Sequence, residues 1–344
     1  MQKPKILLIY TGGTIGMIED PKTGALKAFD FQHLHDQIPE LGRIAAELKA
    51  VSLDEPIDSS DMNPAIWARI ATQVFNSYSD FDGFVILHGS DTMAYSASAL
   101  SFMLQGLQKP IIFTGSQLPI GTIRTDGKEN LITAIEIAAT LDKNGLPLLT
   151  EVAIYFEYTL FRGNRTTKVS AHNFDAFESP NFQPLAKAGV TIQYNPANFF
   201  QTSFSELHLS TEMDDRVALL KIFPGFSPLV YESLFNVNKV KGIVLETFGS
   251  GNGPRNNDFY SMLEKYIADG GVVVNVTQCF SGMVDQGKYA NSTIFNQLGV
   301  VSGRDITTEA AITKLMYLLG NSKSVSGVQA DFRRSLAGEL SAMY

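Results

Sequence analysis

The amino-acid sequence predicts an α/β fold made of two α/β domains. The larger N-terminal domain has a mostly parallel sheet flanked by helices, and the smaller C-terminal domain is Rossmann-like. Short apolar runs alternate along the chain with segments of helical periodicity, which is typical of parallel strands joined by helices. A length of 344 residues, with 44% hydrophobic and 18% charged residues, suits roughly two domains with well-filled cores.

Each expected element follows from its own residues. In the first domain, buried apolar runs predict strands at 5–10, 83–88, 110–114 and 152–156, and helical periodicity predicts helices at 63–78, 93–107 and 127–141. From Glu178 to about Asp214 neither period is sustained. Further buried runs follow at 217–223, 242–248 and 271–276. We therefore expect an N-terminal domain at 1–195, a connector at 196–213 and a C-terminal domain at 214–344.

Charge and composition exclude several classes of protein. A formal net charge of −8 argues against a nucleic-acid partner, because such proteins carry a basic stripe for the phosphates. The single cysteine, Cys279, suits a reducing compartment. The apolar stretch after Lys3 and Lys5 is too short for a signal peptide, and no later run is long enough to span a membrane. We expect a cytosolic protein without a membrane segment.

Polar loops follow the predicted strands of the first domain. In an open α/β sheet, ligands bind beyond the carboxyl ends of the strands, where neighbouring loops meet. Hydroxyls, a carboxylate and a lysine are therefore expected to converge from four loops. These loops are Thr11–Gly16, Gly89–Thr92, Gly115–Gln117 with Arg124–Gly127, and Arg162–Lys168.

Phosphate and metal chemistry are poorly supported. The first loop reads Gly-Gly-x-x-Gly, and no Gly-Lys-Ser/Thr follows it, so it fits neither the dinucleotide nor the nucleoside-triphosphate fingerprint. His33 and His35 lack a third residue at a metal-ligand spacing. For His88, at the end of a buried strand, a structural hydrogen bond is expected rather than catalysis. We expect no metal site.

Hydrolysis by a hydroxyl nucleophile fits the loops better. Threonine and serine need a base, and Lys168 can serve where its environment favours the neutral amine. Asp91 can orient that lysine or hold a substrate ammonium. In the alternative interpretation, Ser90 and Asp91 cap a helix and Lys168 is a surface charge. The coincidence of four polar loops favours a catalytic site over this alternative.

Three segments, in their order and separation, resemble the signature segments of the bacterial L-asparaginases, most closely the type I, cytoplasmic form. They are Thr11-Gly12-Gly13-Thr14-Ile15, His88-Gly89-Ser90-Asp91-Thr92-Met93-Ala94 and Arg162-Gly163-Asn164-Arg165-Thr166-Thr167-Lys168. The resemblance covers nearly the whole chain. It includes Asp58-Ser59-Ser60-Asp61-Met62 and Thr277-Gln278-Cys279.

The resemblance implies hydrolysis of the L-asparagine side-chain amide to L-aspartate and ammonia, with no cofactor and no metal. Thr14 would attack the amide carbon and form an acyl-enzyme that water releases. Ser90, Asp91 and Lys168 would move protons, and Asp91 would also hold the substrate ammonium. Substrate binding would involve Asp58, Ser59 and Ser60, with main-chain N–H groups of the glycine-rich loops stabilising the oxyanion. The family forms homo-oligomers, commonly a tetramer built from two close dimers.

Three positions depart from the family pattern. Ser90 stands where threonine is usual, and it lacks the methyl that restricts χ1. Ala25 follows Gly24, where a loop tyrosine commonly helps to activate the nucleophile. Glu246 occupies the position of an arginine that binds a regulatory asparagine in some type I enzymes. Because a carboxylate repels the effector's carboxylate, we predict weak or absent activation by asparagine.

Three alternatives compete with this interpretation. The asparaginase-like subunit of the archaeal tRNA-dependent amidotransferase carries an extra domain ahead of its Thr-Gly-Gly-Thr loop, whereas only ten residues precede Thr11 here. A glutaminase-leaning member of the same family stays open, because one methylene changes binding by only about 1–3 kcal/mol. A non-catalytic amino-acid-binding protein on the same fold also stays open, since fold does not determine function.

Overall fold

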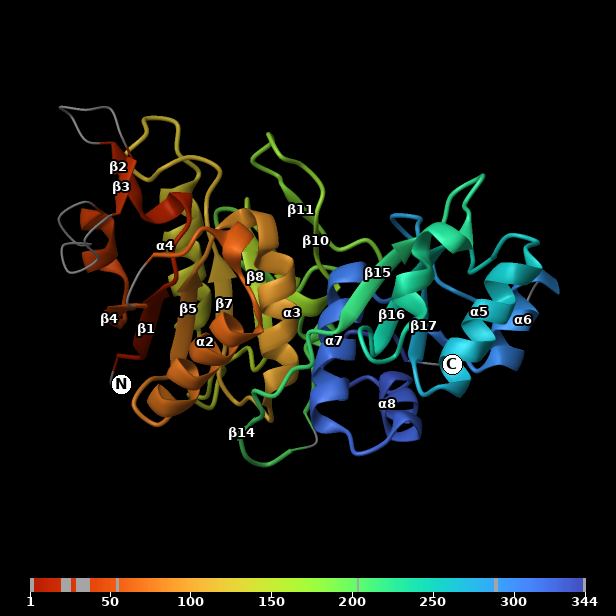
Figure 1. Cartoon of the computed structure of the whole chain (residues 1–344). Helices are drawn as coiled ribbons and strands as arrows, with labels where there is room; N and C mark the ends of the chain where they lie inside the picture. The colour runs from red at the N-terminus through yellow and green to blue at the C-terminus, as the bar shows by residue number, and fades with distance from the viewer. Residues whose placement is uncertain are drawn as a thin grey trace. The chain divides into compact units, whose positions relative to one another are not determined.

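The computed structural model in Figure 1 describes residues 3–19, 26–28, 38–53, 56–202, 204–287 and 290–342. The chain divides into two compact units. One is Met1–Ser179 with Gln183–Leu209, and the other is Pro180–Phe182 with Ser210–Tyr344. Each unit contains a parallel sheet with helices, which confirms the predicted fold class. Gly24, Ala25, His33 and His35 lie outside the described residues.

The sheet of the N-terminal unit has the order β13-β12-β9-β8-β7-β5-β1-β4. Its strands from β8 to β4 are parallel to their neighbours, and the remaining pairs are antiparallel. Every residue of the central strands β5, β7 and β8 is buried, as their continuous apolar runs predict. The strands are β1 (Lys5–Tyr10), β4 (Glu47–Ser52), β5 (Gly83–Leu87), β7 (Ile111–Thr114), β8 (Val152–Phe156), β9 (Thr159–Arg162), β12 (Ala186–Lys187) and β13 (Gln193–Tyr194).

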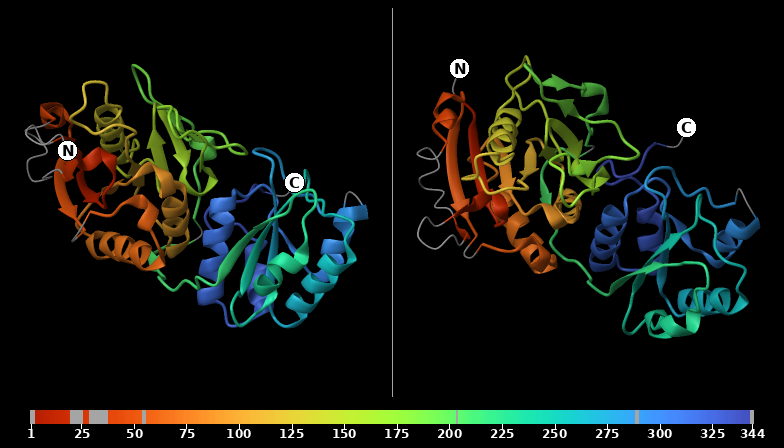
Figure 2. Two further views of the ribbon diagram at one scale, coloured as in Figure 1. Left: turned by 45° about the horizontal axis from the view of Figure 1, so that its top comes forward. Right: turned by 90° about the horizontal axis from the view of Figure 1, so that it is seen from above.

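Helices cover both faces of this sheet. The helices α2 (Pro64–Ser77) and α3 (Met93–Met103) lie on one face, and α4 (Gly127–Ala138) lies on the other (Figure 2). Asn63 begins α2 by accepting hydrogen bonds from the N–H groups of Ala65 and Ile66. The helix α3 ends four residues before the predicted boundary. The next residues form β6 (Leu104–Gln105), which pairs with β14 (His208–Leu209), and Gly106 has a φ of 84°.

Shorter elements complete the N-terminal unit. Two hairpins pair β2 (Met17–Glu19) with β3 (Leu26–Ala28), and β10 (Thr167–Lys168) with β11 (Phe177–Glu178). Single 3-10 turns form at η1 (Thr14–Gly16), η3 (Pro39–Arg43), η4 (Ser59–Asp61), η5 (Ser90–Thr92), η6 (Gly163–Arg165) and η7 (Pro196–Asn198).

The C-terminal unit has a parallel sheet of order β15-β16-β17-β18. Alternate residues of its strands, such as Ile243 and Leu245, join Phe259 and Leu263 of α5 in one buried core. The helices α7 and α8 pack against the opposite face (Figure 2). The elements are β15 (Val217–Lys221), η8 (Pro228–Phe235), β16 (Gly242–Thr247), α5 (Asn257–Ala268), β17 (Val272–Thr277), α6 (Ala290–Leu298), β18 (Val301–Ser302), α7 (Thr308–Asn321) and α8 (Val325–Phe332).

The segment 178–214, expected to lack regular structure, contains three strands of two residues each, β12, β13 and β14. A strand of two residues is too short to show an alternation of apolar and polar side chains, so the sequence pattern cannot predict it. Residues 183–209 belong to the N-terminal unit, where a buried ion pair, 2.6 Å between Arg162 Nε and Glu151 Oε2, holds part of them in place. Arg162 donates to the carbonyl of Asn198, and Glu151 accepts from the N–H of Phe200. Throughout the described ranges, no helix has the length and apolar character that crossing a membrane requires.

Candidate active site

The loop after β1 presents Thr14 on a backbone that only glycine can form. Gly12 and Gly13 have φ angles of 130° and 89°, in the region closed to most residues. A Cβ on Gly12 would lie 2.1 Å from the carbonyl oxygen of Ile57, and one on Gly13 would lie 2.4 Å from the amide nitrogen of Gly89. The loop is therefore in close contact with two other loops. Thr14 itself is half-buried at the start of η1.

The side chain of Tyr10 packs against this loop at Gly16. Its ring lies against Gly16, where an added Cβ would meet ring atoms at 2.2 Å, and its hydroxyl donates to the Gly16 carbonyl over 3.3 Å. Burial raises the pKa of Tyr10 to about 12. The phenol therefore stays protonated at neutral pH and keeps its role as a hydrogen-bond donor.

The loops after β4 and β5 meet at the same place. A Cβ on Gly89 would lie 2.5 Å from Ser59 Oγ, and the Thr92 hydroxyl donates to the Ser59 carbonyl over 2.6 Å. The N–H of Ile57 donates to the Thr11 carbonyl over 2.8 Å. Of the four loops predicted to converge, those that carry Thr14 and Ser90 are therefore in contact, and the loop of Ser59, which was not among the four, joins them.

Lys168, Ser90 and Asp91 form one hydrogen-bonded group. Lys168 Nζ donates to Ser90 Oγ over 2.8 Å and to Asp91 Oδ1 over 2.6 Å. The Lys168 side chain is 15% exposed, whereas that of Asp91 is 70% exposed. One end of the group is thus enclosed by protein, and the carboxylate faces solvent. This arrangement fits proton transfer at Ser90 and binding of a cation at Asp91.

Asp58 and Ser60 lie on the exposed side of the same region. Asp58 Oδ1 accepts from the N–H and the hydroxyl of Ser60, both over 2.9 Å, and so begins η4. The hydrogen bond from the Ser60 main chain, followed by that from its side chain, lowers the pKa of Asp58. Asp58 therefore stays charged at neutral pH, while Ser59 beside it is buried.

His88 acts as a structural residue, as the sequence predicts. It is fully buried, and desolvation lowers its pKa to about 4, so the ring is neutral. Because a carbonyl oxygen only accepts, Nδ1–H donates to the Gly89 carbonyl over 2.7 Å. Nε2 then accepts from the Ser96 hydroxyl over 2.8 Å, and the indole N–H of Trp67 donates to Ser96 over 2.9 Å. This chain of hydrogen bonds holds the main chain next to Ser90.

Three of the predicted catalytic residues, Ser90, Asp91 and Lys168, contact one another directly. The loop that carries Thr14 reaches them through the close approach of Gly13 to Gly89. Within the described residues, no hydrogen bond connects the Thr14 hydroxyl to the group of Ser90, Asp91 and Lys168. Sequence reasoning missed Gln117 as an individual site residue. Its amide oxygen lies 3.2 Å from Ser90 Oγ. The only available signal was its place in the loop after β7.

Glu246 is engaged by its neighbours in the C-terminal unit. Its Oε1 accepts from the Thr308 hydroxyl over 2.7 Å, and its Oε2 lies 3.3 Å from Lys221 Nζ. The carboxylate therefore already has a cation and a donor beside it. For the part of the chain that the structure describes, no cluster of three His, Cys, Asp or Glu side chains could hold a metal ion.

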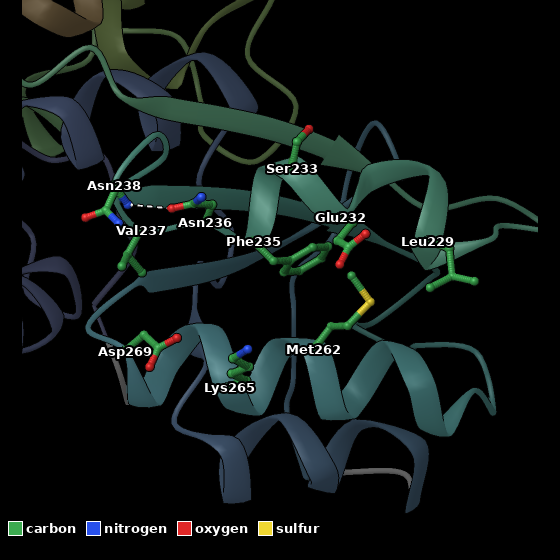
Figure 3. Close-up of a pocket in the computed structure, with 10 residues that line it drawn as sticks. All are labelled: Leu229, Glu232, Ser233, Phe235, Asn236, Val237, Asn238, Met262, Lys265 and Asp269. Carbon is green, nitrogen blue, oxygen red and sulfur yellow. Dashed lines mark hydrogen bonds between the residues drawn. The ribbon is translucent and has the colours of Figure 1, made fainter.

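A separate cavity of about 660 Å³ lies between η8 and α5 in the C-terminal unit (Figure 3). Its lining combines apolar side chains with Lys265 and two carboxylates, Glu232 and Asp269. It contains none of the residues predicted from the sequence, and nothing in it points to one ligand chemistry. The loops of the N-terminal unit therefore remain the candidate active site.

Comparisons with known proteins match almost the whole chain. Residues 5–199 match the family described as Asparaginase, N-terminal, and residues 216–332 match the Glutaminase/Asparaginase C-terminal domain. L-asparaginase 1 of Escherichia coli is 41% identical over 343 residues, which cover 99% of each chain.

Solved structures show the same likeness. L-asparaginase I of Vibrio cholerae superposes with a TM-score of 0.89 and 38% identity, covering 99% of this chain and 100% of that one. A probable cytoplasmic L-asparaginase of Campylobacter jejuni gives a TM-score of 0.80 and 25% identity, covering 97% of this chain and 100% of that one.

Proposed function

The chain belongs to the asparaginase family, and from this membership we propose that Thr14 is the nucleophile with which it hydrolyses the side-chain amide of L-asparagine. The observation that carries the proposal is the hydrogen-bonded group of Lys168, Ser90 and Asp91, built beside the loop that presents Thr14. A hydroxyl, a lysine and a carboxylate in this arrangement can accept and return the protons that acyl transfer through a threonine requires.

The first half of the reaction forms an ester. Thr14 Oγ1 attacks the amide carbon, its proton leaves toward a base of the site, and main-chain N–H groups of the glycine-rich loops stabilise the oxyanion. The C–N bond then breaks, and the departing nitrogen takes up the proton that the base removed from Thr14 and leaves as ammonia. The aspartyl group remains on Thr14.

The second half returns the free enzyme. A water molecule gives its proton to Ser90 Oγ while the Ser90 proton moves to the neutral amine of Lys168, and the resulting hydroxide attacks the ester carbon. The C–O bond to Thr14 breaks, Thr14 Oγ1 takes the proton of the new carboxylic acid, and aspartate is released. Lys168 then gives up its added proton to solvent. The 2.8 Å contact between Lys168 and Ser90 supports this proton path.

Substrate binding is proposed for Asp58, Ser59, Ser60, Ser90 and Asp91. Asp91 uses Oδ1 for Lys168, and its exposed side chain leaves Oδ2 for the substrate ammonium. Hydroxyl and main-chain donors at Ser59 and Ser60 suit the α-carboxylate, because charge-assisted hydrogen bonds to a carboxylate are strong.

Three further expectations accompany this proposal. The segments matched at 5–199 and 216–332 support two domains, at 1–195 and 214–344, joined by a connector at 196–213. We propose a cytoplasmic homotetramer, a dimer of dimers, on the basis of family resemblance; the name of the Campylobacter jejuni protein supports the location. L-asparagine is the proposed substrate in preference to L-glutamine.

Ammonia release tests the proposal. We expect the wild-type protein to release ammonia from L-asparagine, and Thr14→Ala to lower kcat by about 10⁴-fold or more while the fold is unchanged. Thr191→Ala, an exposed threonine of the same unit, is the matched control. L-glutamine is assayed in parallel. Wild-type rates in Thr14→Ala would refute the assigned nucleophile, and faster turnover of L-glutamine would refute the assigned substrate.

A further inference from the structure

Gln117 is attached firmly to the protein around it. Its main-chain N–H donates to both carboxylate oxygens of Asp126, over 3.1 and 2.9 Å, and Asp126 is only 6% exposed. Asp126 also accepts from the side-chain amide of Asn130 over 3.2 Å, and Asn130 is fully buried. Because this carboxylate lies at the start of α4, the position of Gln117 is fixed by the fold.

The side-chain amide of Gln117 has a defined orientation. Its Nε2 donates to the main-chain carbonyl of Asn173 over 2.9 Å. Since that carbonyl only accepts, the NH₂ group must face Asn173, and the amide oxygen must therefore face Ser90. The distance from Ser90 Oγ to this oxygen is 3.2 Å.

This orientation fixes the direction of the Ser90 proton. An amide oxygen cannot donate, so the Ser90 hydroxyl donates to Gln117. The lone pairs of Ser90 Oγ then accept from Lys168, which requires Lys168 to act as the donor. The resting hydrogen bonds consequently run from Lys168 to Ser90 to Gln117.

The geometry points to Gln117 as a positioning residue that holds the Ser90 hydroxyl in place for proton transfer to Lys168. The inference rests on the proposed function of that pair, because it concerns the same proton path. During turnover the Ser90 hydroxyl must rotate from Gln117 toward Lys168, whose nitrogen gains the proton that Ser90 loses. Gln117 also restricts the χ1 rotation of Ser90, which lacks the methyl of a threonine.

Two substitutions separate the acceptor from the rest of the side chain. Gln117→Met keeps an unbranched side chain but removes the acceptor, so the Ser90 hydroxyl loses the partner that holds it. We expect kcat to fall by about 5-fold or more, with KM within roughly twofold of wild type. Gln117→Glu keeps an acceptor for Ser90 Oγ and should restore kcat to within about twofold of wild type. Gln73→Leu, which removes a glutamine bonded to Ser77 within α2, is the control and should leave kcat unchanged.

The inference would be overturned by a wild-type kcat in Gln117→Met, or by an equal fall of kcat in Gln117→Met and Gln117→Glu, as a merely structural role would give. Lys168→Met is assayed in the same series to separate this failure from failure of the proposed function. If Lys168→Met retains wild-type activity, the proton path itself is wrong. If Lys168→Met is inactive and either of those Gln117 results is found, only the role of Gln117 is wrong.

Discussion

Acid conditions should destabilise the N-terminal unit through His88. The ring is fully buried, and desolvation lowers its pKa from 6.5 to about 4. In the unfolded chain the ring is in water and binds a proton near pH 6.5. Between pH 6.5 and 4 the unfolded state therefore carries a proton that the folded state does not. The stabilisation is fully present above pH 6.5 and is lost as the pH falls toward 4.

The difference in pKa sets the size of the effect. A change from 6.5 to about 4 corresponds to roughly 3 kcal/mol over the whole range. Between pH 7 and pH 4.5 the free energy of unfolding should fall by about 2 kcal/mol from this ring alone. His88→Asn removes the titrating group but keeps an N–H donor for the Gly89 carbonyl. Between pH 7 and pH 4.5 its free energy of unfolding should therefore fall by about 2 kcal/mol less than that of the wild type.

Urea unfolding at pH 7 and pH 4.5 measures this difference. Trp67 is the single tryptophan of the chain and donates to Ser96 in the same chain of hydrogen bonds, so its fluorescence reports unfolding of this unit. His88→Asn is expected to be less stable than wild type at pH 7, because Ser96 loses a partner. If both proteins lose equal stability between the two pH values, the buried neutral histidine does not account for the acid sensitivity.

Three further predictions concern other parts of the chain. Gly13→Ala should lower kcat/KM by about 100-fold, since its Cβ would lie 2.4 Å from the neighbouring loop; Gly145→Ala, at a similar φ but with open space around it, should leave activity unchanged. Lys314→Met should lower the free energy of unfolding by about 3–5 kcal/mol, because it leaves the buried carboxylate of Glu339 without its cation. Calorimetry would contradict this if the single variant lost less stability than the double variant Lys314→Met with Glu339→Gln, which removes both charges. Rates plotted against L-asparagine concentration should be hyperbolic, because Glu246 stands where the family resemblance places a regulatory arginine and is already engaged by Thr308 and Lys221; a sigmoidal curve would exclude that explanation.

The sequence predicts the elements of this fold where local pattern decides them. The strands β1 and β8 have the predicted bounds, and α4 begins at the predicted residue, because buried apolar runs and helical periodicity are visible in single segments. The end of α3 was not predicted, because it depends on pairing between β6 and β14, which are about a hundred residues apart in the chain.

The residues of the candidate site also fall into those that the sequence predicts and those that it does not. Ser90 and Lys168 are predicted from residue type and from their place after strands, whereas Thr14 is singled out as the nucleophile only by the family resemblance. Gln117 is not, because its role depends on two distances: one to Ser90, 27 positions away, and one to Asn173, 56 positions away. Only the folded arrangement determines which way its amide faces. Residue type and family resemblance therefore point to the reactive groups, whereas which group donates in each hydrogen bond can be read only from the structure.

The covalent role of Thr14 is tested most directly by trapping the intermediate. Wild-type protein is quenched in acid during turnover of L-asparagine, digested, and its peptides are weighed by mass spectrometry. An aspartyl ester is expected on the peptide that contains Thr14, and it should be absent when Thr14→Ala is treated in the same way. An aspartyl group on the peptide that contains Ser90, or ammonia release at full rate with no adduct on any peptide, would contradict the assignment of Thr14 as the nucleophile.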